Sequence, residues 1–255
     1  MKKSLSTIGF MVLITVLFIS ALASINELTK EQIDRNLQIE KYKSMLYAFN
    51  IFPKGINESQ FSLTSTTDDI PWETAQIREN YETQIISKKI PMEKGDPELL
   101  KNSFLALTDS VEVFIRLNEE NQPTAYGFPM RGKGLWGTIT AFGVISADLT
   151  KMVGIDFTEQ VETPGLGARI LEIEFKQFFR NLDLSRLQNS SAARPAIIMV
   201  RKKEITNMDE STNSLQAITG ATLTCSGVLN MINTDLKFYV NLLRMNEQYL
   251  KNRDS

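Results

Sequence analysis

The sequence of 255 residues contains no histidine and only one cysteine, Cys225. Without histidine, the chain lacks the usual zinc ligand and the commonest general base. A single cysteine excludes an intrachain disulfide, a CxxC redox pair and a cysteine-ligated cluster. We predict no metal site, and any redox chemistry must come from an organic cofactor. One-electron transfer by such a cofactor needs no catalytic residue from the chain, and none is predicted.

Neither sign of charge dominates the sequence. The chain has 28 basic and 30 acidic residues, for a net charge of −2, and no run of basic residues. This balance predicts that nucleic acid is not a partner. A composition that is 42% hydrophobic and 23% charged is typical of a globular protein with one large or two small domains.

One long apolar run lies near the N-terminus. It extends from Ile8 to Ala23, and Lys2 and Lys3 precede it. Continued to about residue 26, the run is long enough to cross a bilayer as one helix, so we predict a transmembrane anchor over residues 1–26. The lysines predict a cytoplasmic N-terminus. A cleaved signal peptide is the alternative, because Ala21-Leu22-Ala23 resembles a cleavage site. Under both interpretations the part of the chain after the apolar run is exported from the cytoplasm.

The segment 27–110 shows two patterns. The residues from Glu27 to Asn50 predict an amphipathic helix, with apolar residues at helical spacing. The residues from about 56 to 100 are polar and punctuated by prolines, which predicts short strands and loops and a short helix after Pro97. We treat 27–110 as a juxtamembrane helix followed by an irregular α/β region.

From Val111 onward the pattern indicates β-structure. Strands are expected at 111–117, 124–128, 138–145, 152–157 and 196–200, and a helix at 175–182. The predicted fold class is α+β, an antiparallel sheet with flanking helices behind one N-terminal transmembrane helix. The domain that carries the chemistry is expected to span 111–255.

The segment Thr219-Gly220-Ala221-Thr222-Leu223-Thr224 has the composition of a turn that opens a helix. The helix is indicated by apolar residues at three- and four-residue steps, namely Leu229, Ile232, Leu236, Tyr239 and Leu243. A helix start exposes unpaired N–H groups and the positive end of the helix dipole, so it suits a phosphate. The small Gly220 and Ala221 let a bulky ligand approach the backbone.

Two further loops are rich in glycine. Glu162-Thr163-Pro164-Gly165-Leu166-Gly167 follows a predicted strand, and Gly132-Lys133-Gly134-Leu135-Trp136-Gly137 precedes another. Their glycines allow backbone amides to approach a flat ligand. Each loop by itself is equally typical of a hairpin connection.

Together, these motifs resemble a known family. In FMN-binding domains a Glu-Thr-Pro-Gly-Leu-Gly segment is followed, about fifty residues later, by Ser/Thr-Gly-Ala-Ser/Thr-x-Ser/Thr, as it is here. The resemblance covers about 111–243 together with the apolar run. It is strongest to C subunits of the Na+-translocating NADH:quinone reductase. Two features favour these subunits over the related G subunits of Rnf complexes: the pair Glu159-Gln160 and the segment Gly134-Leu135-Trp136.

The resemblance implies that FMN is bound covalently, through a phosphoester to Thr224. The remaining contacts with the cofactor are then expected from Thr219, Gly220, Ala221, Thr222, Lys133, Leu135, Trp136, Glu162, Thr163, Gly165, Leu166 and Gly167. Three of these have other interpretations: Trp136 as a core residue, Glu162 as a loop cap and Lys133 as a solvated charge. The sequence departs from the family at Gln216, where aspartate is usual, and at Cys225, where serine is common.

The resemblance also implies a function. The chain would be one subunit of a sodium-transporting translocase that passes electrons from NADH to ubiquinone, and it would relay electrons rather than bind a substrate. Its partners would be the other subunits of this redox pump and, during maturation, an FAD-dependent FMN transferase. The expected location is the bacterial inner membrane, with a single pass and the soluble domain on the periplasmic side.

Three alternatives stay open on the sequence. The chain could be the G subunit of an Rnf-type ferredoxin:NAD oxidoreductase, which would be distinguished by its electron donor. It could be a free-standing exported flavoprotein, which a soluble, cleaved product would indicate. It could also be a structural domain without flavin, although the intact hydroxyls and glycines of the motifs count against this.

Overall fold

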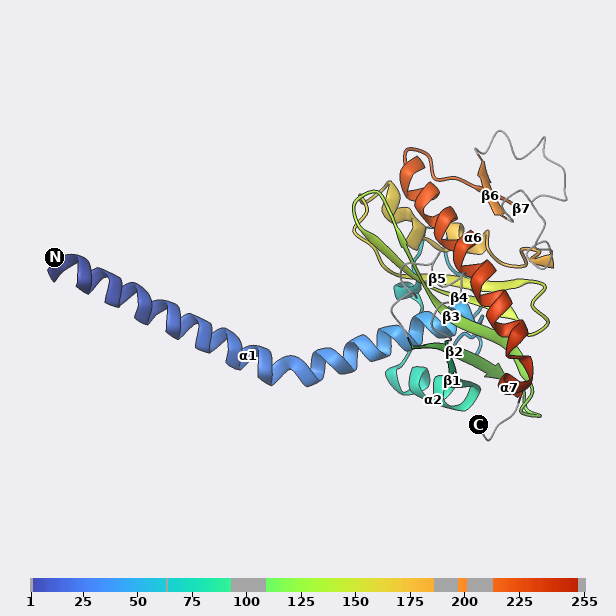
Figure 1. Ribbon diagram of the computed structural model, residues 1–255, viewed down its shortest axis with the longest axis horizontal. Coiled ribbons are helices and arrows are strands. Elements are labelled where there is room, and N and C mark those ends of the chain that lie inside the picture. Colours follow the sequence, from blue (N-terminus) through green and yellow to red (C-terminus); the bar gives the residue numbers. More distant parts are fainter. Residues whose placement is uncertain (1, 63, 93–108, 186–196, 201–212, 252–255) are drawn as a thin grey trace. The chain divides into compact units, whose positions relative to one another are not determined.

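The computed structural model describes residues 2–62, 64–92, 109–185, 197–200 and 213–251 (Figure 1). The chain forms two compact units, Met1–Lys41 and Tyr42–Ser255. Helix α1 (Lys2–Ala48) runs through the first unit, and its last residues belong to the second. The two helices expected before residue 50 are therefore one continuous helix. The helix after Pro97 falls outside the described residues.

Helix α1 is the one described helix long and apolar enough to cross a membrane, judged by its length and composition. Its large apolar side chains between Ile8 and Ile25 are exposed, apart from the half-buried Ile14, as expected for residues that face lipid rather than a protein core. This helix fits a single-pass membrane anchor. The same features suit a signal sequence, so the alternative given by Ala21-Leu22-Ala23 stays open.

The second unit is built on an antiparallel sheet of five strands in sequential order. The strands are β1 (Ile85–Pro91), β2 (Ser110–Leu117), β3 (Pro123–Lys133), β4 (Thr138–Ser146) and β5 (Met152–Glu159). Each pairs with its neighbour along the chain. The predicted α+β class, an antiparallel sheet with flanking helices, is confirmed.

Helices cover both faces of this sheet, which explains why its central strands are apolar on both sides. On one face lies α6 (Thr222–Met245), where Tyr239 stacks on Phe128 of β3 with ring centroids 3.9 Å apart (Figure 1). On the other face the end of α1 brings Phe49 against Phe142. Gly127 of β3 makes room between these two rings, because a Cβ there would lie 2.7 Å from Phe49.

The smaller elements surround the sheet. They are the 3-10 turns η1 (Glu58–Gln60), η2 (Thr67–Asp69) and η3 (Gly167–Leu171), the helices α2 (Thr74–Gln84), α4 (Ile173–Gln177) and α7 (Glu247–Lys251), and the strands β6 (Ile197–Val200) and β7 (Asn213–Gln216). The helix predicted at 175–182 is thus shorter and begins earlier. The expected strand at 196–200 forms as β6, but it pairs in parallel with β7 in a separate two-stranded sheet.

A buried network of charged and polar side chains fastens η2 to the sheet. Lys176 of α4 donates to Asp156 of β5 at 2.7 Å, and Thr67 of η2 donates to the same carboxylate oxygen at 2.9 Å. All three residues are less than 10% exposed. Beside them, Arg180 is paired with Glu58 of η1 at 2.8 Å. Because a buried charge is tolerated only when it is paired, this network fixes where the segment after α1 lies.

Burial of Tyr239 makes the stability of the second unit sensitive to alkaline pH. Burial, reinforced by the charge of Asp235, raises the pKa of Tyr239. An unfolded tyrosine loses its proton near pH 10, so above this pH the folded state binds more protons than the unfolded one. The contribution of the protonated Tyr239 to stability is fully present below pH 10. Above pH 10 this one group should lower the free energy of unfolding by about 1.4 kcal/mol per pH unit.

Urea unfolding between pH 8 and pH 11.5 checks this prediction. Tyr239→Phe should cost about 1 kcal/mol at pH 8, because the hydroxyl donates to the Pro129 carbonyl at 3.0 Å. The same substitution should also make the free energy of unfolding fall less steeply above pH 10. The slope that remains is expected from Tyr47, whose pKa is raised by burial and by the charge of Glu58, and from Tyr81, whose pKa burial raises to about 12. Equal slopes for the wild type and Tyr239→Phe would contradict the assignment.

Candidate functional site

The structure brings the three loops singled out in the sequence together at one end of the sheet. We call them the 132 loop (residues 132–137), the 162 loop (162–167) and the 219 loop (219–224). The 132 loop joins β3 to β4, the 162 loop follows β5, and the 219 loop leads into α6. Because β4 pairs with both β3 and β5, the first two loops start from neighbouring strands. Helix α6 brings the third loop to them.

Glu162 links all three loops. One of its carboxylate oxygens, Oε1, accepts the backbone N–H of Trp136 in the 132 loop at 3.0 Å. The other, Oε2, accepts the hydroxyl of Thr224 in the 219 loop at 2.5 Å. Both Glu162 and Thr224 are buried, at 5% and 1% exposed. A carboxylate held this deep needs donors on both oxygens, and the two neighbouring loops supply them.

A second contact ties Trp136 to the 162 loop. Its indole N–H donates to the Thr163 hydroxyl at 3.1 Å. Trp136 is 68% exposed, so it is not a core residue here. Its backbone and indole nitrogen are fixed while one face of the ring stays available to a ligand.

The glycines of the loops stand where a side chain would not fit. A Cβ on Gly167 would lie 2.6 Å from the Thr224 hydroxyl oxygen, and one on Gly134 would lie 2.4 Å from Glu162 Oε1. Gly165 and Gly220 have φ of +74° and +81°, a region that favours glycine. The close approach of the three loops therefore requires these glycines.

Gly227 completes the site, although the sequence motifs did not single it out. A Cβ on this residue of α6 would lie 2.2 Å from the backbone oxygen of Lys133. Helix α6 can therefore pack on the 132 loop only if residue 227 is glycine. The signal in the sequence was a glycine inside an otherwise apolar helix, which is commonly a sign of close packing.

Gly227→Ala should separate the start of α6 from the 132 loop. We expect a loss of about 1–3 kcal/mol in the free energy of unfolding, as for other overpacked positions, because the clash is with rigid backbone. Thermal and urea unfolding of the full chain measure this. Ser226→Ala, at an exposed neighbour on the same helix, is the matched control and should change stability by less than about 0.5 kcal/mol. An unchanged Gly227→Ala protein would show that α6 is not held this closely.

Exposed apolar side chains gather around the Glu162–Thr224 contact. In the described part of the second unit, six large apolar side chains are exposed, and only Met245 lies away from the three loops. The other five are Leu135, Trp136, Val161, Leu166 and Leu223. Exposed apolar groups that cluster in this way usually mark a surface that binds a ligand or a partner. Here they surround a buried hydroxyl.

The remaining predicted residues lie around this centre. Thr219, Thr222 and Lys133 are exposed, whereas Ala221 is buried at the start of α6. Of the three hydroxyls of the 219 loop, Thr224 alone is buried. No side chain caps the first turn of α6, so its N–H groups can bind an anion. Among the described residues no cluster of His, Cys, Asp and Glu is suited to a metal ion.

The two departures from the family pattern lie on the segment that enters the 219 loop and on the helix that follows it. The Cys225 thiol is buried and accepts the backbone N–H of Ile218 at 3.3 Å, so it fastens the loop. Burial raises the pKa of this thiol, which keeps it protonated and unreactive. Gln216 is the last residue of β7, and its side chain reaches a hollow beside the loop.

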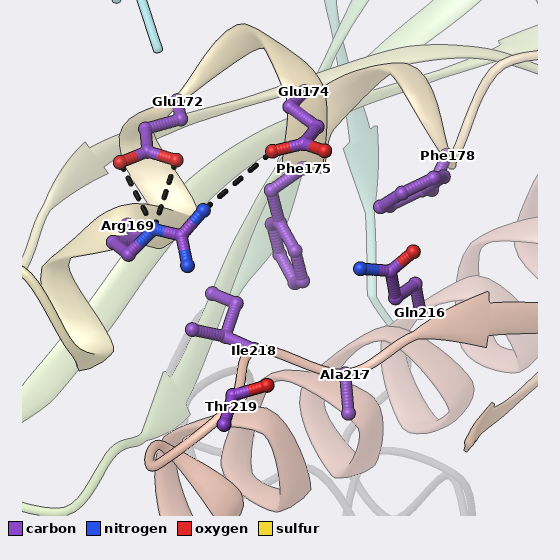
Figure 2. Close-up of a pocket in the computed structure, with 9 residues that line it drawn as sticks. All are labelled: Arg169, Glu172, Glu174, Phe175, Phe178, Gln216, Ala217, Ile218 and Thr219. Atoms are coloured by element: carbon purple, nitrogen blue, oxygen red, sulfur yellow. Dashed lines mark hydrogen bonds and ion pairs between the residues drawn. The ribbon is translucent and has the colours of Figure 1, made fainter. Parts of the chain in front are cut away.

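Figure 2 shows this hollow, which lies between the segment from η3 to α4 and the chain from Gln216 to Thr219. Arg169 on its wall is paired with Glu172 at 3.0 Å and with Glu174 at 3.5 Å. Phe175 and Phe178 form its apolar side. Because the guanidinium is already neutralised by two carboxylates, the hollow is a weak site for a phosphate. Its walls position the strand that leads into the 219 loop.

Comparison with known proteins finds similarity to FMN-binding domains in the part of the chain that holds this site. Residues 134–237 match the family model of the FMN-binding domain. The C subunit of the Na+-translocating NADH-quinone reductase of Haemophilus ducreyi is 26% identical over 235 residues, which cover 90% of this chain and 88% of that protein. Its counterpart in Chlamydia pneumoniae is 34% identical over 124 residues. That alignment covers 46% of this chain and spans only 39% of the length of the relative.

Solved structures agree on the fold. The C subunit of the Parabacteroides distasonis reductase superposes with a TM-score of 0.60 at 22% identity, covering 84% of this chain and 96% of that one. The Shewanella oneidensis NqrC structure gives a TM-score of 0.56 at 16% identity, covering 82% and 97%. The resemblance read from the loop motifs is thereby confirmed: the chain carries a match to the FMN-binding domain family and is similar to C subunits of the Na+-translocating NADH:quinone reductase.

Proposed function

We propose that this chain is an electron-carrying subunit of a membrane Na+-translocating NADH:quinone reductase, with FMN joined to Thr224 through a phosphoester. The observation that carries the proposal is the meeting of the three loops at Glu162, whose carboxylate accepts the Thr224 hydroxyl among exposed apolar side chains. A hydroxyl at a helix start, glycine-lined loops and an apolar rim are the features that a tethered flavin phosphate and its flat ring require.

The residues present fit this group. The uncapped first turn of α6 offers backbone N–H groups and the positive end of its dipole to the phosphate. The exposed hydroxyls of Thr219 and Thr222 can donate to the phosphate oxygens. Leu135, Trp136 and Leu166 offer apolar surface to the ring. Because Thr224 is only 1% exposed, part of the surface that covers its hydroxyl must open before the bond can form.

Bound FMN supplies the redox chemistry, since it accepts and donates electrons one or two at a time. The chain's own contribution is retention and orientation. A covalent bond prevents loss of the cofactor by dissociation, whatever its affinity, which matters for a protein exported to a dilute medium. The backbone N–H groups of the three loops can point toward the ring and stabilise negative charge on it.

The proposal includes a location and partners. Helix α1 would anchor the chain by a single pass in the bacterial inner membrane, with the second unit on the periplasmic side, because Lys2 and Lys3 favour a cytoplasmic N-terminus. The other subunits of the reductase would be permanent partners, and an FAD-dependent FMN transferase a transient one. The names of the relatives favour this reductase over an Rnf complex.

Intact-mass spectrometry of the full chain, produced together with an FMN transferase, tests the proposal. Under denaturing conditions the wild-type chain should carry one added FMN less one water, and its gel band should fluoresce under ultraviolet light. Chain produced without the transferase should have the mass of the polypeptide alone. A colourless wild-type chain of unmodified mass in the presence of an active transferase would refute the proposal.

A further inference from the structure

Glu162 has a contact that binding a flavin does not explain. Its Oε2 receives a hydrogen bond from the Thr224 hydroxyl at 2.5 Å. The oxygen of that hydroxyl, Thr224 Oγ1, is the atom at which the proposed phosphoester forms. A finished phosphoester has no proton on that oxygen, so the contact belongs to the chain before modification. A hydroxyl nucleophile and an adjacent base within hydrogen-bond reach have this arrangement.

The carboxylate is held in place by other groups. The Trp136 backbone N–H fixes Oε1 at 3.0 Å, and the Glu162 backbone N–H is itself bound by Gln160 Oε1 at 2.5 Å. Gly134 and Gly167 leave the space that the side chain fills, since a Cβ on either would lie within 3.0 Å of it. Oε2 is therefore directed at the hydroxyl before any partner arrives.

A threonine hydroxyl is a weak nucleophile at neutral pH and needs a group that takes its proton as it attacks. The chain has no histidine, so the commonest base is lacking. Among the described residues, Glu162 is the side chain that accepts this hydroxyl. A base that is properly placed contributes about 10²–10⁴-fold to a rate.

We propose that Glu162 is the general base for the chain's own flavinylation. The inference rests on the proposed attachment of FMN at Thr224. Thr224 Oγ1 attacks the phosphorus of FAD that carries the riboflavin part, and a bond forms between that oxygen and that phosphorus. The bond from this phosphorus to the bridging oxygen of the pyrophosphate breaks, and AMP leaves. The hydroxyl proton passes to Glu162 Oε2, and no electrons are exchanged.

The test measures the rate at which purified full-length chain in detergent gains the FMN mass from FAD and an added FMN transferase. Glu162→Gln keeps the size of the side chain but removes the carboxylate, and the rate should fall at least about 100-fold. Glu159→Gln, an exposed carboxylate at the end of β5, is the matched control and should react at the wild-type rate. Glu162→Gln modified at a rate close to that of the wild type would overturn the proposal.

A second variant separates base catalysis from a role in folding. Glu162→Ala leaves a space beside Thr224 that a small carboxylate can enter, so added formate should raise its rate of modification several-fold. Formamide, a neutral molecule of the same shape, should not. If formate and formamide act alike, or if neither has an effect, Glu162 is a structural residue and the proposal is wrong.

Failure of this inference differs from failure of the proposed function. If Glu162→Gln gains the flavin at the wild-type rate and Thr224→Ala gains none, the attachment stands and the base is elsewhere. If wild-type chain gains no mass from an active transferase, the attachment itself is wrong, and the inference falls with it.

Discussion

Thr224→Ala should abolish the covalent flavin. With no oxygen at residue 224, the phosphoester cannot form, so the mass of the full chain produced with an FMN transferase should equal that of the polypeptide. Thr224→Ser keeps a hydroxyl at the same place and should still be modified. The measurement is intact mass under denaturing conditions, with flavin fluorescence of the gel band as a second readout.

Thr222→Ala is the matched control for this experiment. Thr222 lies two residues earlier on the same turn and is the more exposed of the two hydroxyls. If access to solvent decided the site of attachment, Thr222 would be modified and its removal would abolish the adduct. We expect instead that Thr222→Ala keeps the full flavin mass, because Thr224 is the hydroxyl paired with a carboxylate. A flavin retained by Thr224→Ala and lost by Thr222→Ala would reverse the assignment.

The loss of flavin in Thr224→Ala must be separated from loss of the fold. The substitution removes one donor from the buried Glu162 carboxylate, which should cost about 1–3 kcal/mol. Trp136 still donates to the other oxygen, so the loops should stay closed. Thermal unfolding of the unmodified wild-type and variant chains is the appropriate comparison. It should show a lower melting temperature and the same cooperative transition.

Lys176→Met should have the largest effect on stability. Lys176 and Asp156 are 2% and 3% exposed, and removal of the cation leaves a buried carboxylate with hydrogen bonds from Thr67 and a backbone N–H. Breaking a buried pair at one partner typically costs about 3–5 kcal/mol. We expect a loss of this size in the free energy of unfolding. Urea unfolding followed by tryptophan fluorescence measures it, because Trp72 packs against the cluster of Tyr47, and Lys176 lies over the Tyr47 ring.

Two controls show that the effect comes from the buried charge. The double variant Lys176→Met with Asp156→Leu removes both charges and should recover at least half of the lost stability, because an apolar pair of similar volume replaces a buried ion pair with little cost. Arg169→Ala breaks an ion pair that is partly exposed and should cost less than about 1 kcal/mol. If Lys176→Met costs no more than Arg169→Ala, the pair does not hold the unit together.

The strands and their pairing could be predicted only in part from the sequence. The alternating residues of 111–117 and the strands that follow it predicted β2 to β5 to within a few residues, because hairpin partners lie next to one another along the chain. Strand β1 is one of the short strands expected between residues 56 and 100, although Lys88 and Lys89 interrupt its apolar pattern. Helix α2 in the same stretch was not expected, because few of its residues are apolar. The parallel pairing of β6 with β7 was missed, because parallel partners are joined by a longer connection whose course the residue pattern does not encode.

The residues of the candidate site divide in the same way. The glycines and hydroxyls of the three loops were singled out from the sequence motifs and their resemblance to FMN-binding domains. Positive φ restricts Gly165 and Gly220 to glycine whatever surrounds them. The hydrogen-bond partner of each polar group could not be predicted from the sequence. Glu162 and Thr224 are 62 residues apart, and Lys176 and Thr67 are 109 apart. Local patterns carry no information on which of many such residues will meet.

The sequence by itself determined the apolar N-terminal run, the antiparallel β-rich body and the three loops that could carry a flavin. The run and the body follow from the period of apolar residues, which depends on near neighbours in the chain. The flavin was inferred from the resemblance of the loop motifs to FMN-binding domains. Only the tertiary structure decided that Thr224 is buried on Glu162 while Thr222 is exposed, and that Gly227 lets α6 reach the 132 loop. Burial and hydrogen bonding depend on what the folded sheet places opposite each side chain, and that is settled only when distant segments pack.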